Sequence, residues 1–317
     1  MESNNFDVII IGSGPAGLTA SIYATRAALS TLILAGTSLG GQLMLTTEVD
    51  NFPGFPEGVM GPELMQKMRK QAERFGAKVI NADVEKVIFT DPPFKIFADG
   101  KEYTSKAVII ATGAETIWLG LENEWKLIGR GVSSCAPCDA PFFKEKKVIV
   151  VGGGDSAMEE ALVLAKFATE VTIVHRRDKF RASDIMQKKV LDEPKIKVMW
   201  NSEVVDVLGE QKVLGVKIKN SQTNETQDFP VDGMFVAIGH SPMSKIFAGH
   251  VDLDEKGYVK KFPREGVEFS TSVEGVFVAG DVHDHHYRQA VTAAGFGCQA
   301  AMDCEKWLEG REKVTSS

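Results

Sequence analysis

The chain has 317 residues, of which 44% are hydrophobic and 25% are charged, as is usual for a globular protein in water. This length favours two compact domains over a single hydrophobic core. The net charge of −7 gives no reason to expect a nucleic acid or an anionic membrane as a partner. Four cysteines are too few for a disulfide-stapled secreted protein, so a closely spaced pair is expected to be catalytic or metal-binding.

The N-terminal segment is apolar at Val8–Ile11 but is not expected to be an export signal. Residues 1–6 contain no basic side chain, and the apolar run passes directly into a glycine-rich turn. No apolar run in the sequence is long enough to cross a bilayer. We therefore expect a cytoplasmic protein with no membrane partner.

The first βαβ pattern lies near the N-terminus, where a β-branched run leads into Gly12-x-Gly14-x-x-Gly17. A small-residue helix is expected at Leu18–Ala28 and a second strand at Thr31–Leu34. The first glycine permits a tight turn, the second lets the backbone approach a pyrophosphate, and the third allows close packing of helix on strand. A turn without a ligand is the alternative, but the preceding strand favours dinucleotide binding.

One expected feature of this pattern is missing. Such a second strand usually ends in an acidic residue that binds a ribose, whereas here it ends in Leu34-Ala35-Gly36. Either the ribose is bound in another way, or the site is weaker than its glycines suggest. Asp281 follows another predicted buried strand at 275–281 and is expected to supply a carboxylate to a different part of the ligand.

The same pattern recurs in the middle of the chain, where a β-branched run leads into Gly152-x-Gly154-x-x-Ala157. A helix is expected at Met158–Ala168 and a second strand at Glu170–Val174. Two βαβ units this far apart indicate two nucleotide-binding domains.

The second of these strands is followed by cationic residues in place of a carboxylate: His175, Arg176, Arg177 and, a little later, Arg181. A carboxylate at this place selects NAD, whereas guanidinium groups accommodate the 2′-phosphate of NADP. A solvated basic turn is the alternative. After a glycine motif of this type, we favour NADPH.

The rest of the chain completes the first domain. Apolar strands are expected at 107–113 and 233–239, and a helix at 288–308. The segment after the second domain is too short to fold alone, so we expect it to return to the first. The predicted fold class is α/β, with two Rossmann-like dinucleotide-binding domains, the second inserted into the first. The expected boundaries are 1–114 and 242–317 for the first domain and 115–241 for the second, with linkers near Gly113–Thr116 and Gly239–Pro242.

The motif Cys135-Ala-Pro-Cys138 is the best candidate for chemistry. A zinc site would need further ligands, and no second Cys-x-x-Cys exists. Two unrelated buried thiols would not need this spacing, and a thioredoxin fold has no place for two nucleotide sites. We therefore favour a redox-active pair. Asp139 follows the pair directly, as an ordinary helix-capping acid or as a proton shuttle for thiol–disulfide exchange.

Other cysteines and histidines are expected to be uninvolved. Cys298 and Cys304 lie six positions apart on the predicted C-terminal helix and are interpreted as spare or buried thiols. His283, His285 and His286 are interpreted as part of a solvated loop, so no metal site is predicted.

Together these motifs are highly specific, and the chain resembles the low-molecular-weight thioredoxin reductases over nearly its whole length. The matching segments are Gly12–Gly17, Gly40–Leu43, Thr47–Gly54, Cys135–Asp139, Gly152–Ala161, His175–Arg177, Gly280–Asp281 and Tyr287–Ala290.

The resemblance implies FAD in the first, split domain and NADPH in the second. The implied FAD contacts are Gly12, Ser13, Gly14, Pro15, Ala16, Gly17, Gly41, Gln42, Asn51, Val84, Gly113, Gly280, Asp281, Arg288, Gln289 and Ala290. The implied NADPH contacts are Gly152, Gly154, Asp155, Ser156, Ala157, His175, Arg176, Arg177, Arg181 and Ile238.

The resemblance also implies a reaction. In such enzymes hydride passes from NADPH to flavin, and electrons then pass to the disulfide. Cys138 would face the flavin, Cys135 would attack the disulfide of thioredoxin or a thioredoxin-like protein, and Asp139 would be the acid–base group. Family members rotate their domains between the half-reactions, with hinges at linkers of this kind, and they are commonly homodimers.

Two residues depart from the family pattern. Pro137 stands where Thr or Val is usual and is expected to leave the chemistry intact while shifting the redox potential. Ala140 stands where Gly is usual and is expected to alter the turn after the pair. Two other functions remain open from sequence: a flavin-dependent reductase or oxidase of another dithiol, and a non-catalytic flavin redox sensor.

Overall fold

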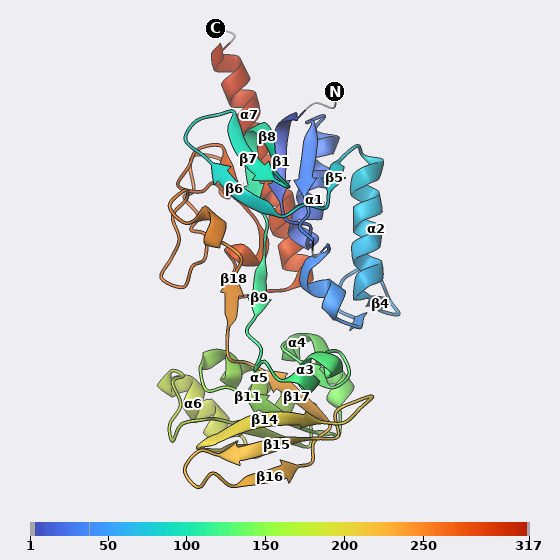
Figure 1. Ribbon diagram of the computed structural model, residues 1–317, viewed down its shortest axis with the longest axis vertical. Coiled ribbons are helices and arrows are strands. Elements are labelled where there is room, and N and C mark those ends of the chain that lie inside the picture. The colour runs from blue at the N-terminus through green and yellow to red at the C-terminus, as the bar shows by residue number, and fades with distance from the viewer. Residues whose placement is uncertain (1–3, 38, 316–317) are drawn as a thin grey trace. The chain divides into compact units, whose positions relative to one another are not determined.

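The computed structural model describes residues 4–37 and 39–315. The chain divides into two compact units, and each is described here by itself (Figure 1). Unit 1 consists of residues 1–115 and 241–317, and unit 2 of residues 116–240. Each unit contains parallel strands with helices packed against them, which confirms the predicted α/β class.

The sheet of unit 1 is centred on β1 (Asn5–Ile11), whose last four side chains are buried. β1 pairs in parallel with β2 (Thr31–Leu34) and, on its other side, with β8 (Lys101–Ile110). β5 (Lys78–Ile80) pairs with β2, and β19 (Val276–Val278) pairs in parallel with β8. The C-terminal segment therefore returns to the first sheet, where continuous apolar runs suit strands covered on both faces.

The remaining strands of unit 1 are antiparallel. β6 (Val84–Ile88) pairs with β7 (Phe94–Ala98), which pairs with the first half of β8. The short strands β3 (Glu48–Val49) and β4 (Val59–Met60) form a separate pair.

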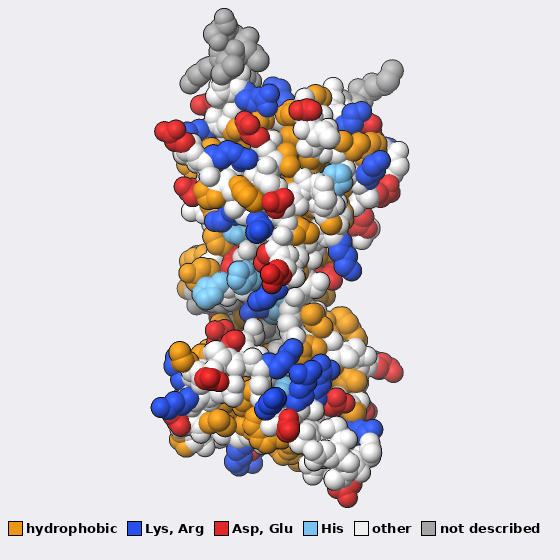
Figure 2. Space-filling view, turned by 90° about the vertical axis from the view of Figure 1, so that its left-hand side faces the viewer, with side chains coloured by type: hydrophobic (Ala, Val, Ile, Leu, Met, Phe, Trp, Pro, Cys, Tyr) orange, Lys and Arg blue, Asp and Glu red, His pale blue; other side chains and the backbone are white. Residues whose placement is uncertain are grey.

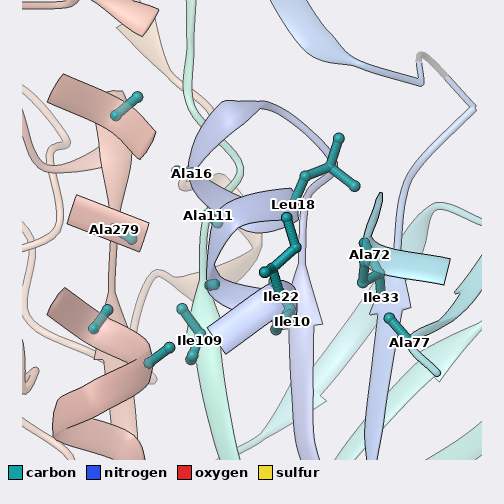
Figure 3. Close-up of a cluster of buried hydrophobic side chains, with 14 of the residues drawn as sticks. Ile10, Ala16, Leu18, Ile22, Ile33, Ala72, Ala77, Ile109, Ala111 and Ala279 are labelled. Carbon is teal, nitrogen blue, oxygen red and sulfur yellow. The ribbon is translucent and has the colours of Figure 1, made fainter. Parts of the chain in front are cut away.

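Three helices of unit 1 bury a common core. They are α1 (Pro15–Arg26), α2 (Gly61–Arg74) and α7 (Ala290–Thr315). Helices α1 and α7 pack closely, because a Cβ atom at Gly297 would lie 2.1 Å from the Ala16 carbonyl oxygen. Figure 3 shows the core side chains between α1 and the strands, with Ile10, Ile33 and Ile109 from the sheet and Leu18 and Ile22 from α1.

The larger sheet of unit 2 is wholly parallel, with strand order β10-β17-β11-β12-β13. These strands span Val132–Ser133 (β10), Gly233–Val236 (β17), Lys147–Val151 (β11), Glu170–Val174 (β12) and Ile196–Met199 (β13).

The two faces of this sheet are covered differently. Side chains from α5 (Asp155–Ala165) and α6 (Asp184–Leu191) share one buried cluster with one face. An antiparallel sheet of β14 (Ser202–Leu208), β15 (Gly215–Asn220) and β16 (Thr226–Phe229) contributes to the cluster on the other face.

Short helical segments complete the fold. They are α3 (Glu122–Leu127), α4 (Ala136–Asp139), η1 (Gly41–Leu45), η2 (Ala140–Phe143), η3 (Lys245–Phe247) and η4 (Gly280–Val282).

The structure differs from the predicted elements at the linkers and at two helix starts. The segments expected as linkers contain short strands, β9 (Ala114–Thr116) and β18 (His240–Pro242), which pair with each other. Helices α1 and α5 begin three residues earlier than predicted, because the backbone is already helical directly after the extended glycines Gly14 and Gly154. Within residues 4–37 and 39–315, no helix combines the length and apolarity needed to cross a bilayer.

Candidate active site

The first glycine loop connects β1 to α1 and has one open position. Gly12 has φ +113°, and a Cβ atom there would lie 2.3 Å from the Ala111 carbonyl oxygen. A Cβ atom at Gly17 would lie 2.0 Å from the Gly12 carbonyl oxygen. At Gly14, in contrast, a Cβ atom would meet nothing within 4 Å. The loop is therefore tightly packed against other backbone atoms at Gly12 and Gly17 and open at Gly14. Gly14 lies beside the N-terminus of α1, where an anion is favoured.

Ser13 ties neighbouring segments to this loop. Its buried hydroxyl donates to the Ala35 carbonyl at 2.8 Å and accepts the Gly40 N–H at 3.1 Å. Gly41 consequently lies beside Gly14, since a Cβ atom on Gly41 would be 3.7 Å from the Gly14 Cα. Gln42, the next residue of η1, is exposed.

Where the sequence lacks an acidic residue after β2, another segment brings one nearby. The carboxylate of Asp83 accepts the Thr37 N–H at 2.9 Å and the Thr37 hydroxyl at 3.0 Å. Asp83 was not predicted, because it follows β5 and lies far from the motif in sequence. Val84, which was predicted, is the next residue and begins β6.

Asp281 lies in η4, directly after β19, and the preceding Gly280 packs against Ala16 at the start of α1. The Oδ1 atom of Asp281 is buried, and no described residue donates a hydrogen bond to it. Burial raises the pKa of Asp281 to about 7; the charge of Asp284 acts in the same direction, and that of Arg288 opposes it. A buried oxygen without a donor has the capacity to accept a hydrogen bond from a ligand hydroxyl group.

The segment before α7 brings further predicted residues together. Burial raises the pKa of Asp284, but N–H groups of Tyr287, His286 and Arg288 donate to its carboxylate at 2.9–3.1 Å and bring the net pKa below its ordinary value. Gln289 accepts a hydrogen bond from Asn51 at 3.1 Å.

The remaining two predicted residues of unit 1, Ala290 and Gly113, lie at the ends of regular elements. Ala290 begins α7. Gly113 follows β8, and its carbonyl accepts the Met243 N–H at 3.0 Å.

The histidine loop corrects one prediction. His285 and His286 are exposed, as expected of a solvated loop. His283, however, packs against Phe269 and Phe296, with ring centroids 5.7 and 4.9 Å away. Burial lowers its pKa to about 4, so the ring is neutral at physiological pH. Across the described part of the chain, no group of His, Cys, Asp and Glu residues is suited to a metal ion.

The two other cysteines differ in exposure. Cys304 is buried, which raises its pKa above the ordinary range, whereas Cys298 is partly exposed. This agrees with their interpretation as spare or buried thiols.

The second glycine loop, between β11 and α5, repeats the design of the first. A Cβ atom at Gly152 would lie 2.4 Å from the Ala237 carbonyl oxygen, whereas one at Gly154 would meet nothing within 4 Å. Gly153 packs on the ring of His175, where a Cβ atom would lie 2.2 Å from Cε1.

His175 supports this loop from beneath. The side chain is buried, and Nε2 lies 3.0 Å from the Lys179 carbonyl oxygen. Its ring also contacts Phe180 and Trp200. Burial lowers the pKa of His175, and the charges of Arg181 and Arg177 act in the same direction.

The arginine segment after β12 is fastened to the second loop at two points. The Arg181 N–H donates to the Gly153 carbonyl at 2.7 Å. The N–H and hydroxyl of Ser183 donate to the Asp155 carboxylate at 2.9 and 2.8 Å.

The arginines themselves remain accessible. The side chains of Arg176, Arg177 and Arg181 are exposed, and Figure 2 shows Lys and Arg side chains gathered on one face of unit 2. Ser156 lies in the first turn of α5, and Ile238 follows β17, both partly buried. Unit 2 therefore presents cations beside an open helix N-terminus.

Cys135 and Cys138 form a disulfide, with their Cα atoms 5.3 Å apart. Helix α4 begins directly after Cys135, whose carbonyl accepts the N–H groups of Cys138 and Asp139 at 3.2 and 3.1 Å. Pro137 is exposed. Ala140 is buried and has right-handed helical dihedrals, so this turn does not require the glycine that is usual in the family.

Residues around the disulfide hold this turn in place. Ser133 accepts the Cys135 N–H at 3.0 Å, and the carboxylate of Glu160 on α5 accepts the Ala136 N–H. Asp139 is mostly buried; burial raises its pKa, and a hydrogen bond from the Ser133 side chain opposes that rise. Ser133 and Glu160 were not predicted, since a serine in a strand and a glutamate in a helix carry no distinctive pattern.

Comparison with known proteins identifies the family. Residues 6–297 match the pyridine nucleotide-disulphide oxidoreductase family. A thioredoxin reductase of Streptomyces coelicolor is 53% identical over 305 residues, which cover 95% of this chain and 94% of that protein. The chain belongs to the thioredoxin reductase family.

Solved structures agree with this assignment. A thioredoxin reductase from Giardia duodenalis has a TM-score of 0.90 and 43% identity, covering 96% of this chain and 99% of that one. The enzyme from Streptococcus pyogenes has a TM-score of 0.92 and 37% identity, covering 98% of this chain and 100% of that one.

The thioredoxin reductase family consists of oxidoreductases that use FAD and NADPH, and the residues of this family member fit both cofactors. Gly14 and Gly154 each leave room for a diphosphate at a helix N-terminus. The unpaired oxygen of Asp281 suits the hydroxyl groups of FAD. The exposed arginines suit the 2′-phosphate of NADPH. The comparisons do not favour a non-catalytic sensor.

Proposed function

We propose that this oxidoreductase transfers electrons from NADPH, through FAD and the Cys135–Cys138 disulfide, to oxidised thioredoxin or a thioredoxin-like protein. The observation that carries the proposal is a Cys-x-x-Cys disulfide at a helix start in a unit that also holds a glycine loop flanked by arginines. Relatives named thioredoxin reductase resemble the chain over 95% of its length. One relative, from Mycobacterium leprae, is a bifunctional thioredoxin reductase/thioredoxin, 52% identical over 66% of its own length.

In this proposal FAD binds unit 1 and NADPH binds unit 2. The open face at Gly14, the neighbouring Gly41 and the unpaired Asp281 oxygen support the first assignment. Gly154 and the fastened arginine segment, represented by Arg177, support the second. When bound, the two cofactors supply a hydride and, from it, the electron pair that reduces the disulfide.

Cys135 and Cys138 then divide the exchange between them. The Cys135 thiolate attacks the partner's disulfide and forms a mixed disulfide, releasing one partner sulfur as a thiolate. Cys138 then attacks Cys135, which restores the intramolecular disulfide and releases the second partner sulfur. Two electrons and two protons pass from the enzyme dithiol to the partner. The adjacent Asp139, whose pKa is raised by burial, serves as the acid–base group.

The proposal includes rotation of the units between half-reactions, about β9 and β18. The chain passes between the units only through these two short segments, which supports a hinge there. We also propose a homodimer in the cytosol, where a reducing environment suits a transient, catalytic disulfide.

The test is steady-state turnover of the holoenzyme with NADPH and oxidised thioredoxin, and the oxidation of NADPH is the readout. Wild type is expected to turn over, and Cys135→Ser to lose thioredoxin reduction. If NADPH reduces the bound flavin and the Cys135–Cys138 disulfide but the enzyme does not reduce thioredoxin, the proposal is overturned in favour of another dithiol substrate.

A further inference from the structure

We propose that Glu160 is a positioning residue for disulfide exchange, because its carboxylate binds the Ala136 N–H and so places a negative charge beside Cys135. This charge disfavours the Cys135 thiolate and makes the reduced cysteine pair a stronger reductant. The proposal deepens the function proposed above and rests on it. It assigns a role in the exchange to a residue of helix α5, outside the Cys-x-x-Cys motif.

The Ala136 N–H is a buried backbone group that needs an acceptor. Ala136 is 0% exposed and is the first residue of α4. The first N–H groups of a helix have no acceptor within the helix, and a buried N–H without a partner is costly. The carboxylate of Glu160 accepts this N–H. The bond therefore satisfies a group that the redox turn itself leaves without an acceptor.

The packing of α5 on α4 explains why Glu160 reaches this position. Ala136 shares a buried cluster with Ala157 and Ala161 of α5. These two alanines are four residues apart and lie on the same face of the helix, and their small side chains allow the two helices to approach closely. Glu160, beside this face, is half-buried. Its carboxylate is consequently held at the turn by the packing of the two helices.

The other backbone N–H groups of the turn are already bonded or missing. The Cys135 N–H donates to the Ser133 hydroxyl at 3.0 Å, and those of Cys138 and Asp139 donate to the Cys135 carbonyl at 3.2 and 3.1 Å. Cys135 is the N-cap of α4, and an N-cap side chain usually accepts from the second or third helical residue. Here the second is Pro137, which has no N–H, and the third is Cys138. The turn thus gives a Cys135 thiolate little stabilisation from its backbone.

The charged groups around the turn single out Glu160. Helices α5 and η2 pack against α4, and η2 contains no titratable side chain. Helix α5 carries Asp155, Glu159 and Glu160. The Asp155 carboxylate accepts hydrogen bonds from Ser183, and Glu159 is exposed. Glu160 is therefore the acidic side chain that α5 brings to the redox turn, where Asp139 is the other carboxyl group.

The effect of this charge follows from the exchange reaction. The two enzyme thiols give two electrons and two protons to the partner; the partner's S–S bond breaks, and the Cys135–Cys138 bond forms. A dithiol whose thiolate is stabilised is a weak reductant, and one without that stabilisation is a strong reductant. A neighbouring carboxylate disfavours a thiolate. Glu160 therefore favours transfer of electrons to the partner, and the thiolate that does form is more nucleophilic.

The direct test is the pH dependence of alkylation of Cys135 by iodoacetamide, in FAD-loaded Cys138→Ser enzyme reduced beforehand. Mass spectrometry follows the Cys135 peptide alone, so other thiols do not contribute. Glu160→Gln removes the charge but keeps an oxygen that can accept the Ala136 N–H, and it is expected to lower the pH midpoint of the reaction. Glu159→Gln makes the same change on the exposed neighbour and should leave the midpoint unchanged. Glu160→Ala is the second variant if the glutamine variant does not fold.

The size of the effect can be estimated. If the charge shifts the midpoint by about one pH unit, the thiolate fraction below the midpoint rises about tenfold. The lower nucleophilicity of the more acidic thiolate offsets part of this gain, so the alkylation rate should rise about threefold.

Equilibration of the reduced enzyme with oxidised thioredoxin above the midpoint gives the second readout. With both cysteines present, Glu160→Gln should lower the equilibrium constant for thioredoxin reduction several-fold, whereas Glu159→Gln should not. Equal midpoints with and without Glu160→Gln, or equal shifts in the Glu159 and Glu160 variants, would overturn the proposal. A shifted midpoint in an enzyme whose wild type does not reduce thioredoxin would instead overturn the proposed function.

Discussion

Replacing Gly154 by alanine separates the effect on nucleotide binding from the effect on the stability of the fold. The backbone at Gly154 has φ −100° and ψ −179°, an extended conformation that alanine adopts without strain. A Cβ atom there meets nothing within 4 Å. Gly154 is the N-cap of α5, where alanine is less favourable than glycine, but alanine also restricts the unfolded chain, so the free energy of unfolding should change by less than about 1 kcal/mol.

The effect on binding should be much larger, because the new methyl group enters the space left for the diphosphate. If it displaces a phosphate oxygen from one backbone N–H, the loss is that of a charge-assisted hydrogen bond, about 1.5–3 kcal/mol. The dissociation constant of NADP⁺ should then rise about 10- to 150-fold.

The assay is calorimetric titration of the oxidised holoenzyme with NADP⁺, with bound FAD measured by absorbance. Gly14→Ala is the matched control, since Gly14 is also extended and also open. It should reduce FAD retention and leave NADP⁺ affinity unchanged. If Gly154→Ala binds NADP⁺ as tightly as wild type while Gly14→Ala weakens it, the assignment of cofactors to the two loops is reversed.

Three further changes test other parts of the site. Arg177→Gln should raise KM for NADPH about tenfold or more while leaving NADH unaffected, because only the 2′-phosphate loses a partner; equal losses for both nucleotides would contradict this. Asp155→Ala removes the acceptor for Ser183 and frees the arginine segment, so NADPH affinity should fall while retained FAD stays constant in absorbance spectra. Asp281→Asn tests the pKa of about 7: the folded state binds the proton more tightly than the unfolded state, so the contribution of this group to stability is present at low pH and is lost as pH rises from about 4 to 7. From pH 5 to pH 7 the cofactor-free wild type should lose about 2 kcal/mol relative to the variant in urea unfolding. The variant is compared at each pH because His283, with its lowered pKa, has the opposite dependence; a difference independent of pH would contradict the raised pKa.

The nucleotide-binding strands were predictable because burial on both faces demands unbroken apolar runs. Both second strands, Thr31–Leu34 and Glu170–Val174, have the predicted bounds. The helix starts were wrong by three residues, because a glycine motif says little about where its own residues become helical. The paired strands at the linkers were missed, since a three-residue strand depends on a partner far away in sequence.

The candidate site was predictable where a motif is local. The disulfide of Cys135 and Cys138 was predicted from spacing, whereas the individual cofactor contacts stay predictions until the two loops are tested. The contacts of Ser133 and Glu160 depend on how a strand and a helix converge on the turn, which no short sequence pattern encodes. His283 was misjudged because aromatic partners from two distant segments bury it.

The central claim is that the Cys135–Cys138 disulfide receives electrons from the flavin. Anaerobic titration of the FAD-loaded enzyme with NADPH tests it most directly. Wild type is expected to take up four electrons, two for the flavin and two for the disulfide, and Cys138→Ser only two. Uptake of four electrons by the Cys138→Ser variant would contradict the claim.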